Sequence, residues 1–257
     1  MRQSFKTVTE LPGSGAPTEQ VAMLYTRYHL AASVSQGKDV LEVACGPGIG
    51  LGYLAKRARM IVGGDYDEEL LRYARGYYRD GIRLLRLDAH NLPFADGSFD
   101  VVILFEALYY FAAPEKFVDE ARRVLRPQGT LLVCTANKDW FGFNPSPFAE
   151  RYFSVSELHG LLASRGFATE LYGSFPINAA TLRDRLLLAV RRFAVTLHLI
   201  PTTMKGKELF KKLVYGKLSS LPSELQEGIA EPSALVPLVT YVPTSAFKVL
   251  YAIGRAP

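Results

Sequence analysis

The chain has few of the residues that build disulfide frameworks, metal sites or membrane spans. Its 257 residues include only two cysteines, Cys45 and Cys134, and four histidines. These residues show no metal-ligand spacing, so we expect no metal, and two cysteines cannot staple a domain of this size. The longest nearly uncharged apolar stretch, 186–200, contains Arg191 and Arg192 and is too short to cross a bilayer. Without a basic, then apolar leader, the sequence predicts a soluble, cytoplasmic protein.

Net positive charge is confined to one segment. The chain carries +5 overall, yet residues 183–217 hold nine Lys or Arg against Asp184 and Glu208. Three interpretations stay open: a solvated basic face, a site for an acidic acceptor, or peripheral contact with an anionic membrane that holds a lipid-like acceptor. Nucleic acid is not an expected partner, because the segment lacks the interleaved, exposed aromatic side chains of a strand-binding groove.

The sequence does have a regular alternation of short apolar runs with segments of helical periodicity. Alternation with fully apolar runs is typical of a parallel sheet covered by helices on both faces. We therefore predict an α/β fold with a doubly wound, mostly parallel seven-stranded sheet. The predicted strands lie at 39–44, 60–65, 82–89, 99–108, 130–137, 168–175 and 246–255.

Two regions depart from this alternation. Residues 1–19 are polar with the turn sequence LPGSGAP, and we predict a flexible N-terminal arm there. Residues 176–243 are predicted to form a helical insertion between strands six and seven. The sheet core then covers 20–175, beginning with a helix, and its closing strand lies in 244–257. Ligands of doubly wound sheets bind beyond the carboxyl ends of the strands, so the insertion is expected to act as a lid on the substrate side.

A glycine loop follows the first apolar run. Gly46 and Gly48 allow a tight turn and leave backbone N–H groups open to a polar or anionic ligand. Asp65 ends the second run, where doubly wound sheets hold a ribose diol. We expect Asp67 to cap the next helix, which leaves Asp65 available. Loop and acid together fit a nicotinamide-dependent dehydrogenase as well as other nucleotide-binding proteins.

The stretch RLLRLDAHNLPFADGSFDVVIL, residues 83–104, is more specific. Together with VLEVACGPG, GGDYDEELL and EARRVLRPQGTLLV, it resembles the class I S-adenosylmethionine (SAM)-dependent methyltransferase family over about residues 20–175. The resemblance implies a Rossmann-like SAM-binding core and SAM as the cofactor. It also implies an antiparallel last strand, which AFKVLYAIGR at 246–255 fits.

The resemblance further implies which residues bind the cofactor. They divide by the part of SAM that they would contact. Glu42, Gly46 and Gly48 would line the methionine part, Asp65 the ribose, Tyr66, Asp88 and Ala89 the adenine, and Phe105 the sulfonium, while Tyr25 and Tyr28 would close over the cofactor.

The same resemblance has two departures. Ala44 stands where the family often has glycine, and Tyr109–Tyr110 stand where many relatives carry a histidine pair. A base is needed only if the acceptor must lose a proton, and Glu106, Tyr109 and His29 are the candidate catalytic residues.

The resemblance therefore predicts an enzyme, a SAM-dependent methyltransferase that acts on a small-molecule acceptor at oxygen. A sugar-like, aromatic or lipid-like acceptor fits this reading. A non-catalytic SAM-binding protein of the same fold is the alternative, and a nicotinamide-dependent dehydrogenase is a further one.

Overall fold

The structure is a computed structural model that describes residues 5–177 and 218–257. Within these ranges each helix lies in a segment for which the sequence predicts helical periodicity. One 3-10 turn follows the central strand that ends at Phe105. The helices and this turn are α1 (Thr18–Val34), α2 (Leu51–Ala55), α3 (Glu68–Tyr78), η1 (Leu108–Tyr110), α4 (Pro114–Val124) and α5 (Val155–Ala163).

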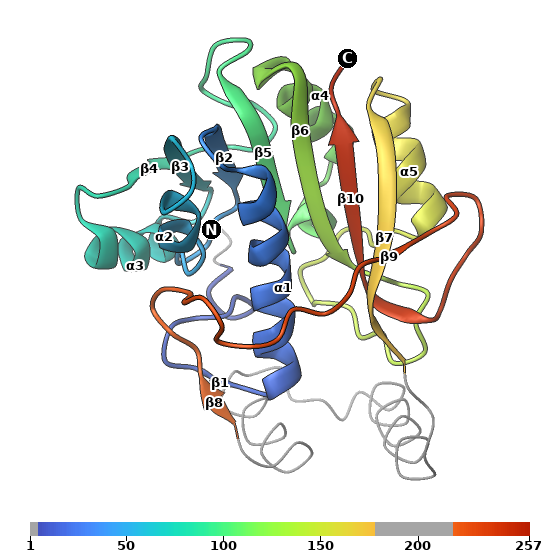
Figure 1. The fold of residues 1–257 in the computed structure, drawn as a ribbon, viewed down its shortest axis with the longest axis horizontal. Coiled ribbons are helices and arrows are strands. Elements are labelled where there is room, and N and C mark those ends of the chain that lie inside the picture. Colours follow the sequence, from blue (N-terminus) through green and yellow to red (C-terminus); the bar gives the residue numbers. More distant parts are fainter. Residues whose placement is uncertain (1–4, 178–217) are drawn as a thin grey trace.

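The strands form one large sheet and one small pair (Figure 1). The small pair joins β1 (Gly15–Ala16) to β8 (Ser219–Ser220). The large sheet has the order β4-β3-β2-β5-β6-β10-β7-β9. Its strands are β2 (Asp39–Val43), β3 (Met60–Asp65), β4 (Arg83–Arg86), β5 (Phe99–Phe105), β6 (Leu125–Ala136), β7 (Ala168–Pro176), β9 (Val236–Pro237) and β10 (Phe247–Arg255).

The large sheet is parallel from β4 to β6 and antiparallel around β10. β10 pairs with both β6 and β7 in the antiparallel sense. The prediction of a mostly parallel sheet with an antiparallel last strand is therefore confirmed. The chain reverses its winding between β2 and β5, which is where doubly wound sheets open a crevice for ligands.

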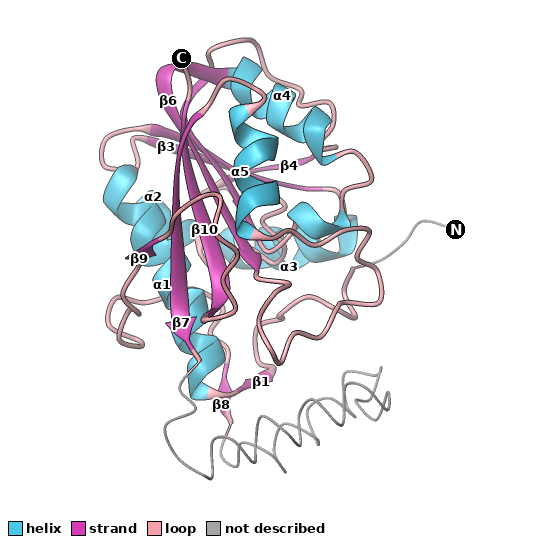
Figure 2. Cartoon of the chain, turned by 90° about the vertical axis from the view of Figure 1, so that its right-hand side faces the viewer, coloured by secondary structure: helices cyan, strands magenta, loops and turns pink. Residues whose placement is uncertain are grey.

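Helices cover both faces of the sheet (Figure 2). Side chains alternate between these two faces and build a separate core on each. On β2, Leu41 and Val43 belong to the core beneath α4 and α5, whereas Val40 belongs to the core beneath α1 and α2. This burial on both faces explains why the predicted strands contain continuous apolar runs.

Local capping signals in the sequence are also confirmed. The Asp67 side chain accepts a hydrogen bond from the Glu69 N–H and caps α3. Ser154 and Glu157 form a reciprocal capping box at the start of α5. Because Asp67 is the N-cap residue of α3, the Asp65 carboxylate at the end of β3 is not needed to cap that helix.

Residues 1–19 were expected to form a flexible arm, but their described part is packed against the core. The Phe5 N–H donates to Asp67 Oδ2 over 2.8 Å, and the Phe5 ring lies 5.1 Å from that of Tyr110. Glu10 forms an ion pair with Arg27 of α1, and β1 pairs with β8. Buried aromatic contacts and a charge pair thus hold residues 5–17 in place, and α1 already begins at Thr18.

The predicted helical insertion is only partly described. Residues 178–217 lie outside the described residues, and the basic segment 183–217 with them. Residues 218–243 contain no helix, which corrects the prediction for this part: four prolines and Gly228 interrupt it, and proline lacks the N–H that a helix interior requires. This part crosses α1 (Figure 1), where the Ser233 N–H donates to Thr26.

Among the helices that the structure describes, none is long and apolar enough to span a membrane.

Candidate active site

A cavity of about 940 Å³ lies at the carboxyl ends of the parallel strands. One side, here called the strand-end wall, comes from the residues that follow β2, β3 and β4. The other side, here called the aromatic wall, comes from the N-terminal segment, η1 and the loop after β6. The strand-end wall consists of Glu42, Ala44, Gly46, Asp65, Tyr66, Asp88 and Ala89, and the aromatic wall of Phe5, Tyr109, Tyr110, Phe111, Trp140 and Phe143.

The glycine loop after β2 is held against β3 by Asp65. The Gly46 N–H donates to Asp65 Oδ2 over 2.7 Å, and the Asp67 N–H donates to Oδ1 over 2.8 Å. Gly46 has a φ of 57° and Ala44 a φ of 56°, so both occupy the left-handed region. Ala44 therefore has the conformation that the glycine of related loops adopts readily, and its methyl group makes it costlier.

Burial raises the pKa of Asp65 to about 6, against the hydrogen bonds from backbone N–H groups, which lower it. A buried carboxylate with this pKa is largely ionised at pH 7. It can still accept further hydrogen bonds, because each carboxylate oxygen has two acceptor sites.

Glu42 is the most deeply buried acid of the strand-end wall. Its Oε1 accepts a hydrogen bond of 2.5 Å from the Tyr28 hydroxyl, while its Oε2 has no partner in the described structure. Burial raises the pKa of Glu42 to about 7, and the hydrogen bond from Tyr28 and the charge of Arg27 oppose that rise. A buried carboxylate oxygen without a partner is costly, so this position suits a ligand that brings a donor or a positive charge.

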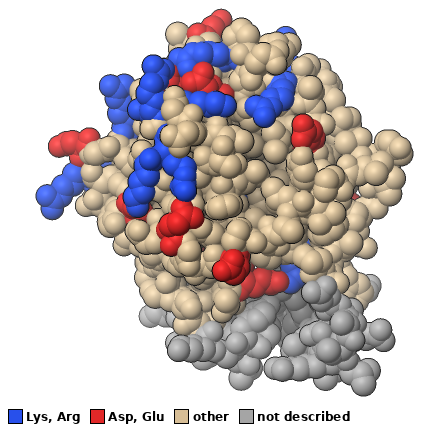
Figure 3. Space-filling view, viewed as in Figure 1, with Lys and Arg blue, Asp and Glu red and all other residues tan. Residues whose placement is uncertain are grey.

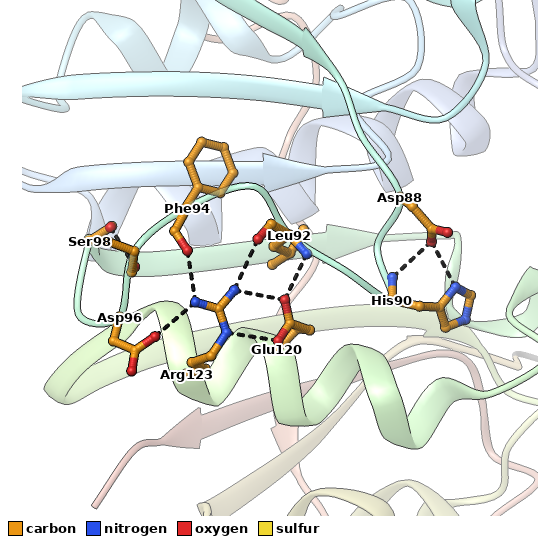
Figure 4. A network of polar contacts seen from close by, with 9 residues as sticks. Asp88, His90, Leu92, Phe94, Asp96, Ser98, Glu120 and Arg123 are labelled. Carbon is orange, nitrogen blue, oxygen red and sulfur yellow. Dashed lines mark hydrogen bonds and ion pairs between the residues drawn. The ribbon is translucent and has the colours of Figure 1, made fainter.

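Asp88 follows β4 on a tightly anchored loop (Figure 4). Its Oδ1 accepts from the His90 N–H over 2.9 Å and contacts His90 Nδ1 at 2.8 Å. Although burial acts in the opposite direction, these hydrogen bonds lower the pKa of Asp88. Asp88 thus stays ionised, and both contacts from His90 are made to its Oδ1.

The next part of this loop is fixed from α4. Arg123 donates to the carbonyl oxygens of Leu92 and Phe94 and forms ion pairs with Asp96 and Glu120 (Figure 4). Glu120 in turn accepts from the Leu92 N–H over 2.7 Å. These contacts give the NLPFADG sequence after Asp88 a structural role. Its backbone groups and Asp96 bind Arg123 and Glu120 of α4, and this fixes the loop that contains Asp88 and Ala89.

Glu106 lies where the two walls meet. It follows β5 directly and has a φ of 52°, a conformation that is strained for a residue with a side chain. Its Oε2 accepts a hydrogen bond from Tyr109 over 3.2 Å, and its Oε1 lies 3.6 Å from Cys134 Sγ. Burial raises the pKa of Glu106, and the nearby charge of Arg27 opposes the rise. Glu106 is therefore a buried acid poised closer to neutral pH than a surface glutamate.

Aromatic rings in contact with one another shape the opposite wall. Tyr109 stacks on Tyr152 with 4.4 Å between the ring centroids, and Phe143 meets the edge of Tyr152 at 4.6 Å. The Phe5 ring extends this wall by packing on the Tyr110 ring. This part of the cavity is suited to an apolar or aromatic ligand.

Arg27 lines the same cavity and did not figure among the predicted site residues. It sits on α1, and its Nη2 lies 3.1 Å from Glu10 Oε2. Burial lowers the pKa of Arg27, but the charges of Glu10 and Glu106 outweigh burial and raise it overall. The sequence offered one weak signal, since Arg27 interrupts the apolar spacing of Leu24 and Tyr28.

The structure brings most of the predicted site residues together but corrects three of them. Tyr25 does not line the cavity; its hydroxyl donates to Glu227, on the side of α1 that faces α2. His29 is half exposed and lies 3.9 Å from the same Glu227, so it cannot reach an acceptor in the cavity. Gly48 lies beneath the loop, where a side chain would meet Ala74 of α3 at 3.0 Å. The remaining predicted positions line the cavity, namely Glu42, Gly46, Asp65, Tyr66, Asp88, Ala89, Phe105, Tyr28, Glu106 and Tyr109.

Charge on the described surface is mixed rather than uniform. On the face shown in Figure 3, Lys and Arg side chains gather in the upper part, with Asp and Glu side chains among them. Among the ion pairs of the described residues, Arg126 pairs with Asp39 at 2.9 Å and with Asp100 at 2.8 Å. In residues 5–177 and 218–257, no three His, Cys, Asp or Glu side chains are grouped to hold a metal ion.

Comparison with known proteins identifies relatives of this site and fold. A family model described as "Methyltransferase domain" matches residues 41–133. A phthiotriol/phenolphthiotriol dimycocerosates methyltransferase of Mycobacterium ulcerans is 40% identical over 200 residues, covering 75% of this chain and 69% of the relative. A fatty-acid O-methyltransferase of Mycolicibacterium smegmatis is 36% identical over 114 residues, covering 42% of each chain.

Other matches cover less of the relative or concern the fold alone. A protein of M. smegmatis named as a probable S-adenosylmethionine-dependent methyltransferase is 39% identical over 150 residues, which is 56% of this chain and 57% of the relative. The chain thus spans little more than half the length of the first curated relatives that it matches. A SAM-dependent methyltransferase of Thermotoga maritima shares the fold with a TM-score of 0.58 at 17% identity, covering 92% of this chain and 91% of that one.

Proposed function

This chain belongs to the class I SAM-dependent methyltransferase family, and from that premise we propose that it methylates an oxygen atom of a lipid-like small molecule. Family membership removes the nicotinamide-dependent dehydrogenase as an alternative. One observation carries the proposal. The strand-end wall with its acids, the aromatic wall and Glu106 all line the same cavity.

The strand-end wall fits SAM in charge and in shape. Glu42, with one buried oxygen lacking a partner, would receive the ammonium of the methionine part. Asp65 would hold the ribose hydroxyls, and Asp88 with the Ala89 N–H would hold the adenine beside Tyr66. Phe105 would border the sulfonium, where an aromatic ring stabilises a cation. Tyr28 would fix the orientation of Glu42 through its hydrogen bond of 2.5 Å.

The chemistry asked of the protein is modest. When bound, SAM supplies a methyl group on a positively charged sulfur, and in the transfer the acceptor oxygen bonds to the methyl carbon while the carbon–sulfur bond breaks with its electron pair left on sulfur. The protein's part is to align the acceptor, exclude water and, for a hydroxyl acceptor, remove a proton. Glu106 is the base, and the Tyr109 hydroxyl orients it over 3.2 Å.

A lipid-like acceptor is supported by the aromatic wall and by the printed names of two relatives. Phe5, Trp140 and Phe143 offer an apolar surface in the same cavity. One relative is named for a phthiotriol lipid and another for fatty acids. Residues 176–243 would add to the substrate side, and contact of 183–217 with a membrane or an acidic acceptor is part of the same proposal.

The proposal is tested by methyl transfer from isotopically labelled SAM to a panel of acceptors. The panel contains a fatty alcohol, the fatty acid of equal chain length, a simple phenol and a hexose, and product formation is measured by mass spectrometry. Asp65→Ala serves as the variant that should bind the cofactor much more weakly. At a SAM concentration near the wild-type KM, we expect transfer to the lipids and a strongly reduced rate with Asp65→Ala.

Two results would contradict the proposal. Labelled product on the hexose alone would remove the lipid-like acceptor. Tight binding of S-adenosylhomocysteine in calorimetry, without turnover of any acceptor, would favour the non-catalytic SAM-binding alternative.

A further inference from the structure

The ring of His90, in the loop after β4, contacts residues of both cavity walls. Its Nδ1 lies 2.8 Å from Asp88 Oδ1, and the His90 main-chain N–H donates to the same oxygen over 2.9 Å. On the other side, the ring packs against Phe111 with 5.2 Å between the ring centroids. Phe111 in turn packs against Phe117 of α4 at 5.5 Å. The position of the His90 ring is therefore fixed from two sides.

The contact with Asp88 determines where the His90 ring carries its hydrogen. An ionised carboxylate only accepts hydrogen bonds, so Nδ1 is the nitrogen that donates. In the neutral ring Nε2 then has no hydrogen. Nε2 is buried and has no hydrogen-bond partner among the described residues, so a positive charge there would be costly. Geometry and burial together favour the neutral ring with its hydrogen on Nδ1.

The two contacts from His90 leave the second carboxylate oxygen of Asp88 available. Within residues 5–177 and 218–257, Asp88 Oδ2 accepts no hydrogen bond, whereas Oδ1 accepts both contacts (Figure 4). Asp88 lines the cavity, yet 52% of its side chain is exposed. An exposed carboxylate is free to rotate into water unless a neighbour holds it. His90 restricts this rotation and so gives Oδ2 one orientation.

We propose that His90 is a positioning residue of the cofactor site: by holding Asp88 Oδ1 it directs Oδ2 at the adenine amino group, and so selects a purine with an amino group over one with a carbonyl group on the same carbon. The inference rests on the proposed function, in which Asp88 holds the adenine. It concerns the cofactor alone and does not depend on the acceptor.

The selection follows from the hydrogen-bonding groups of the two purines. The amino group of adenine donates, and a carboxylate oxygen accepts from it. The carbonyl oxygen of hypoxanthine only accepts, so it would face Asp88 Oδ2 with no hydrogen between the two oxygens. A site built around one hydrogen bond rejects a ligand that cannot make it. A carboxylate that rotates freely escapes this conflict and can reach the N1–H of hypoxanthine instead, so the selection requires the restraint from His90.

A direct role of His90 in proton transfer fits the structure less well. A general base must come within hydrogen-bond reach of the acceptor. Nδ1 of His90 is occupied by Asp88, and Nε2 is buried. His90 therefore acts through Asp88 rather than on the reacting atoms.

The test measures the binding of two ligands by calorimetry, S-adenosylhomocysteine and S-inosylhomocysteine, which carries hypoxanthine in place of adenine. His90→Ala removes the ring, whereas His90→Asn keeps a side-chain N–H close to the position of Nδ1. Asn91→Ala, at the next and exposed position of the loop, is the matched control.

We expect the wild type to prefer S-adenosylhomocysteine by about 10- to 100-fold, the usual range for a hydrogen bond to a charged group. In His90→Ala the preference should fall below about fivefold, chiefly through weaker binding of S-adenosylhomocysteine. His90→Asn should restore most of the preference, and Asn91→Ala should keep all of it. Because the preference is a ratio of two affinities of one variant, a change in stability alone does not alter it.

A second measurement reports the hydrogen position directly. The ring nitrogens of His90 are observed by 15N NMR in the free protein at neutral pH and assigned with His90→Asn. We expect the hydrogen on Nδ1. A hydrogen on Nε2 with Nδ1 bare would remove the contact with Asp88 and overturn the inference.

Three further results decide against the inference. An equal loss of affinity for both ligands in His90→Ala would mean that the ring only shapes the loop. A loss of methyl-transfer rate in His90→Asn at unchanged affinity for S-adenosylhomocysteine would place His90 in catalysis instead. If Asp88→Ala loses the preference and His90→Ala keeps it, the inference fails and the proposed adenine contact stands. By contrast, wild-type affinity and preference in Asp88→Ala would overturn the adenine contact of the proposed function itself.

Discussion

The two walls of the cavity are built in different ways. The strand-end wall draws on residues within a few positions of the ends of β2, β3 and β4, and hydrogen bonds between buried or loop-facing side chains and the backbone hold its loops. The aromatic wall draws on segments more than a hundred residues apart, from Phe5 to Trp140, held by ring packing. The sheet therefore determines the shape of the strand-end wall. The shape of the aromatic wall depends on how side chains from distant segments pack together.

This difference has a consequence for specificity. A wall made of backbone turns and strand ends keeps its shape when surface side chains change, so it suits a part of the ligand that never varies. A wall made of side chains can be remodelled one residue at a time without disturbing the sheet. The relatives named for different lipids are consistent with such a division.

The largest expected effect is a loss of kcat without a loss of cofactor affinity, which would show that the two walls act independently. Glu106→Gln removes the base and should lower kcat for a hydroxyl acceptor by about 10² to 10⁴-fold, the usual contribution of general base catalysis. The affinity for S-adenosylhomocysteine, measured by calorimetry, should change by less than about twofold, since Glu106 lies beyond the strand-end wall. Glu231→Gln, at an exposed position, is the control. An equal loss in both quantities would mean that the walls are not separable.

Asp65→Ala should show the opposite pattern. It removes the ribose acceptor and the anchor of the Gly46 and Asp67 N–H groups, and we expect S-adenosylhomocysteine to bind about 100-fold more weakly, or roughly 3 kcal/mol. Asp65→Asn keeps one oxygen for the loop and should lose less. Asp80→Ala, an exposed substitution, should bind normally. Unchanged affinity in Asp65→Ala would show that the strand-end wall does not hold the cofactor.

A third prediction concerns the effect of pH on Glu42 in the strand-end wall. Burial raises the pKa of Glu42 to about 7, so lowering the pH below this value protonates Glu42 and removes the charge that faces the ligand ammonium. Affinity for S-adenosylhomocysteine should then fall, approaching tenfold per pH unit. Tyr28→Phe removes a hydrogen bond that lowers this pKa, so the decline should begin at higher pH. Calorimetry across this range is the measurement, and a flat affinity down to about pH 5 would contradict the role of Glu42.

The smallest expected effect tests the backbone of the strand-end wall. Ala44 has a φ of 56°, where a side chain costs about 1–2 kcal/mol, partly offset by the greater freedom of glycine in the unfolded chain. Ala44→Gly should raise the free energy of unfolding by about 0.5 kcal/mol in urea titrations. Ala22→Gly, in the interior of α1, should instead lower it, because glycine is about 1 kcal/mol less favourable than alanine inside a helix. A loss of stability in Ala44→Gly would mean that the methyl group packs well enough to outweigh the strain.

The sequence predicted one wall far better than the other, for physical reasons. β3 was predicted to the residue, because its apolar run lies between the charged residues Arg59 and Asp65. Asp65 and Asp88 were singled out as candidates because Asp65 ends this strand and because the family resemblance points to Asp88 after β4. Arg27 was missed, because an arginine on an apolar helix face usually extends to solvent, and no local pattern links it to Glu106.

Two other predictions failed where tertiary contacts decide the outcome. Tyr25 and Tyr28 share one face of α1 by spacing, yet Glu227 draws the Tyr25 hydroxyl away from the cavity. Residues 5–17 looked mobile from their glycines and prolines, but Phe5 and Glu10 each find a partner distant in the sequence. A single sequence carries no signal for either contact.

The position of β10 bears on how the chain assembles during synthesis. β10 pairs with both β6 and β7, yet it emerges after residues 177–246. The parallel half of the sheet can form as soon as β6 is complete, whereas β7 must wait for a neighbour that has not yet been translated. Nascent protein would therefore pass through a stage with the edge of β6 open, the stage most exposed to aggregation and most in need of a chaperone.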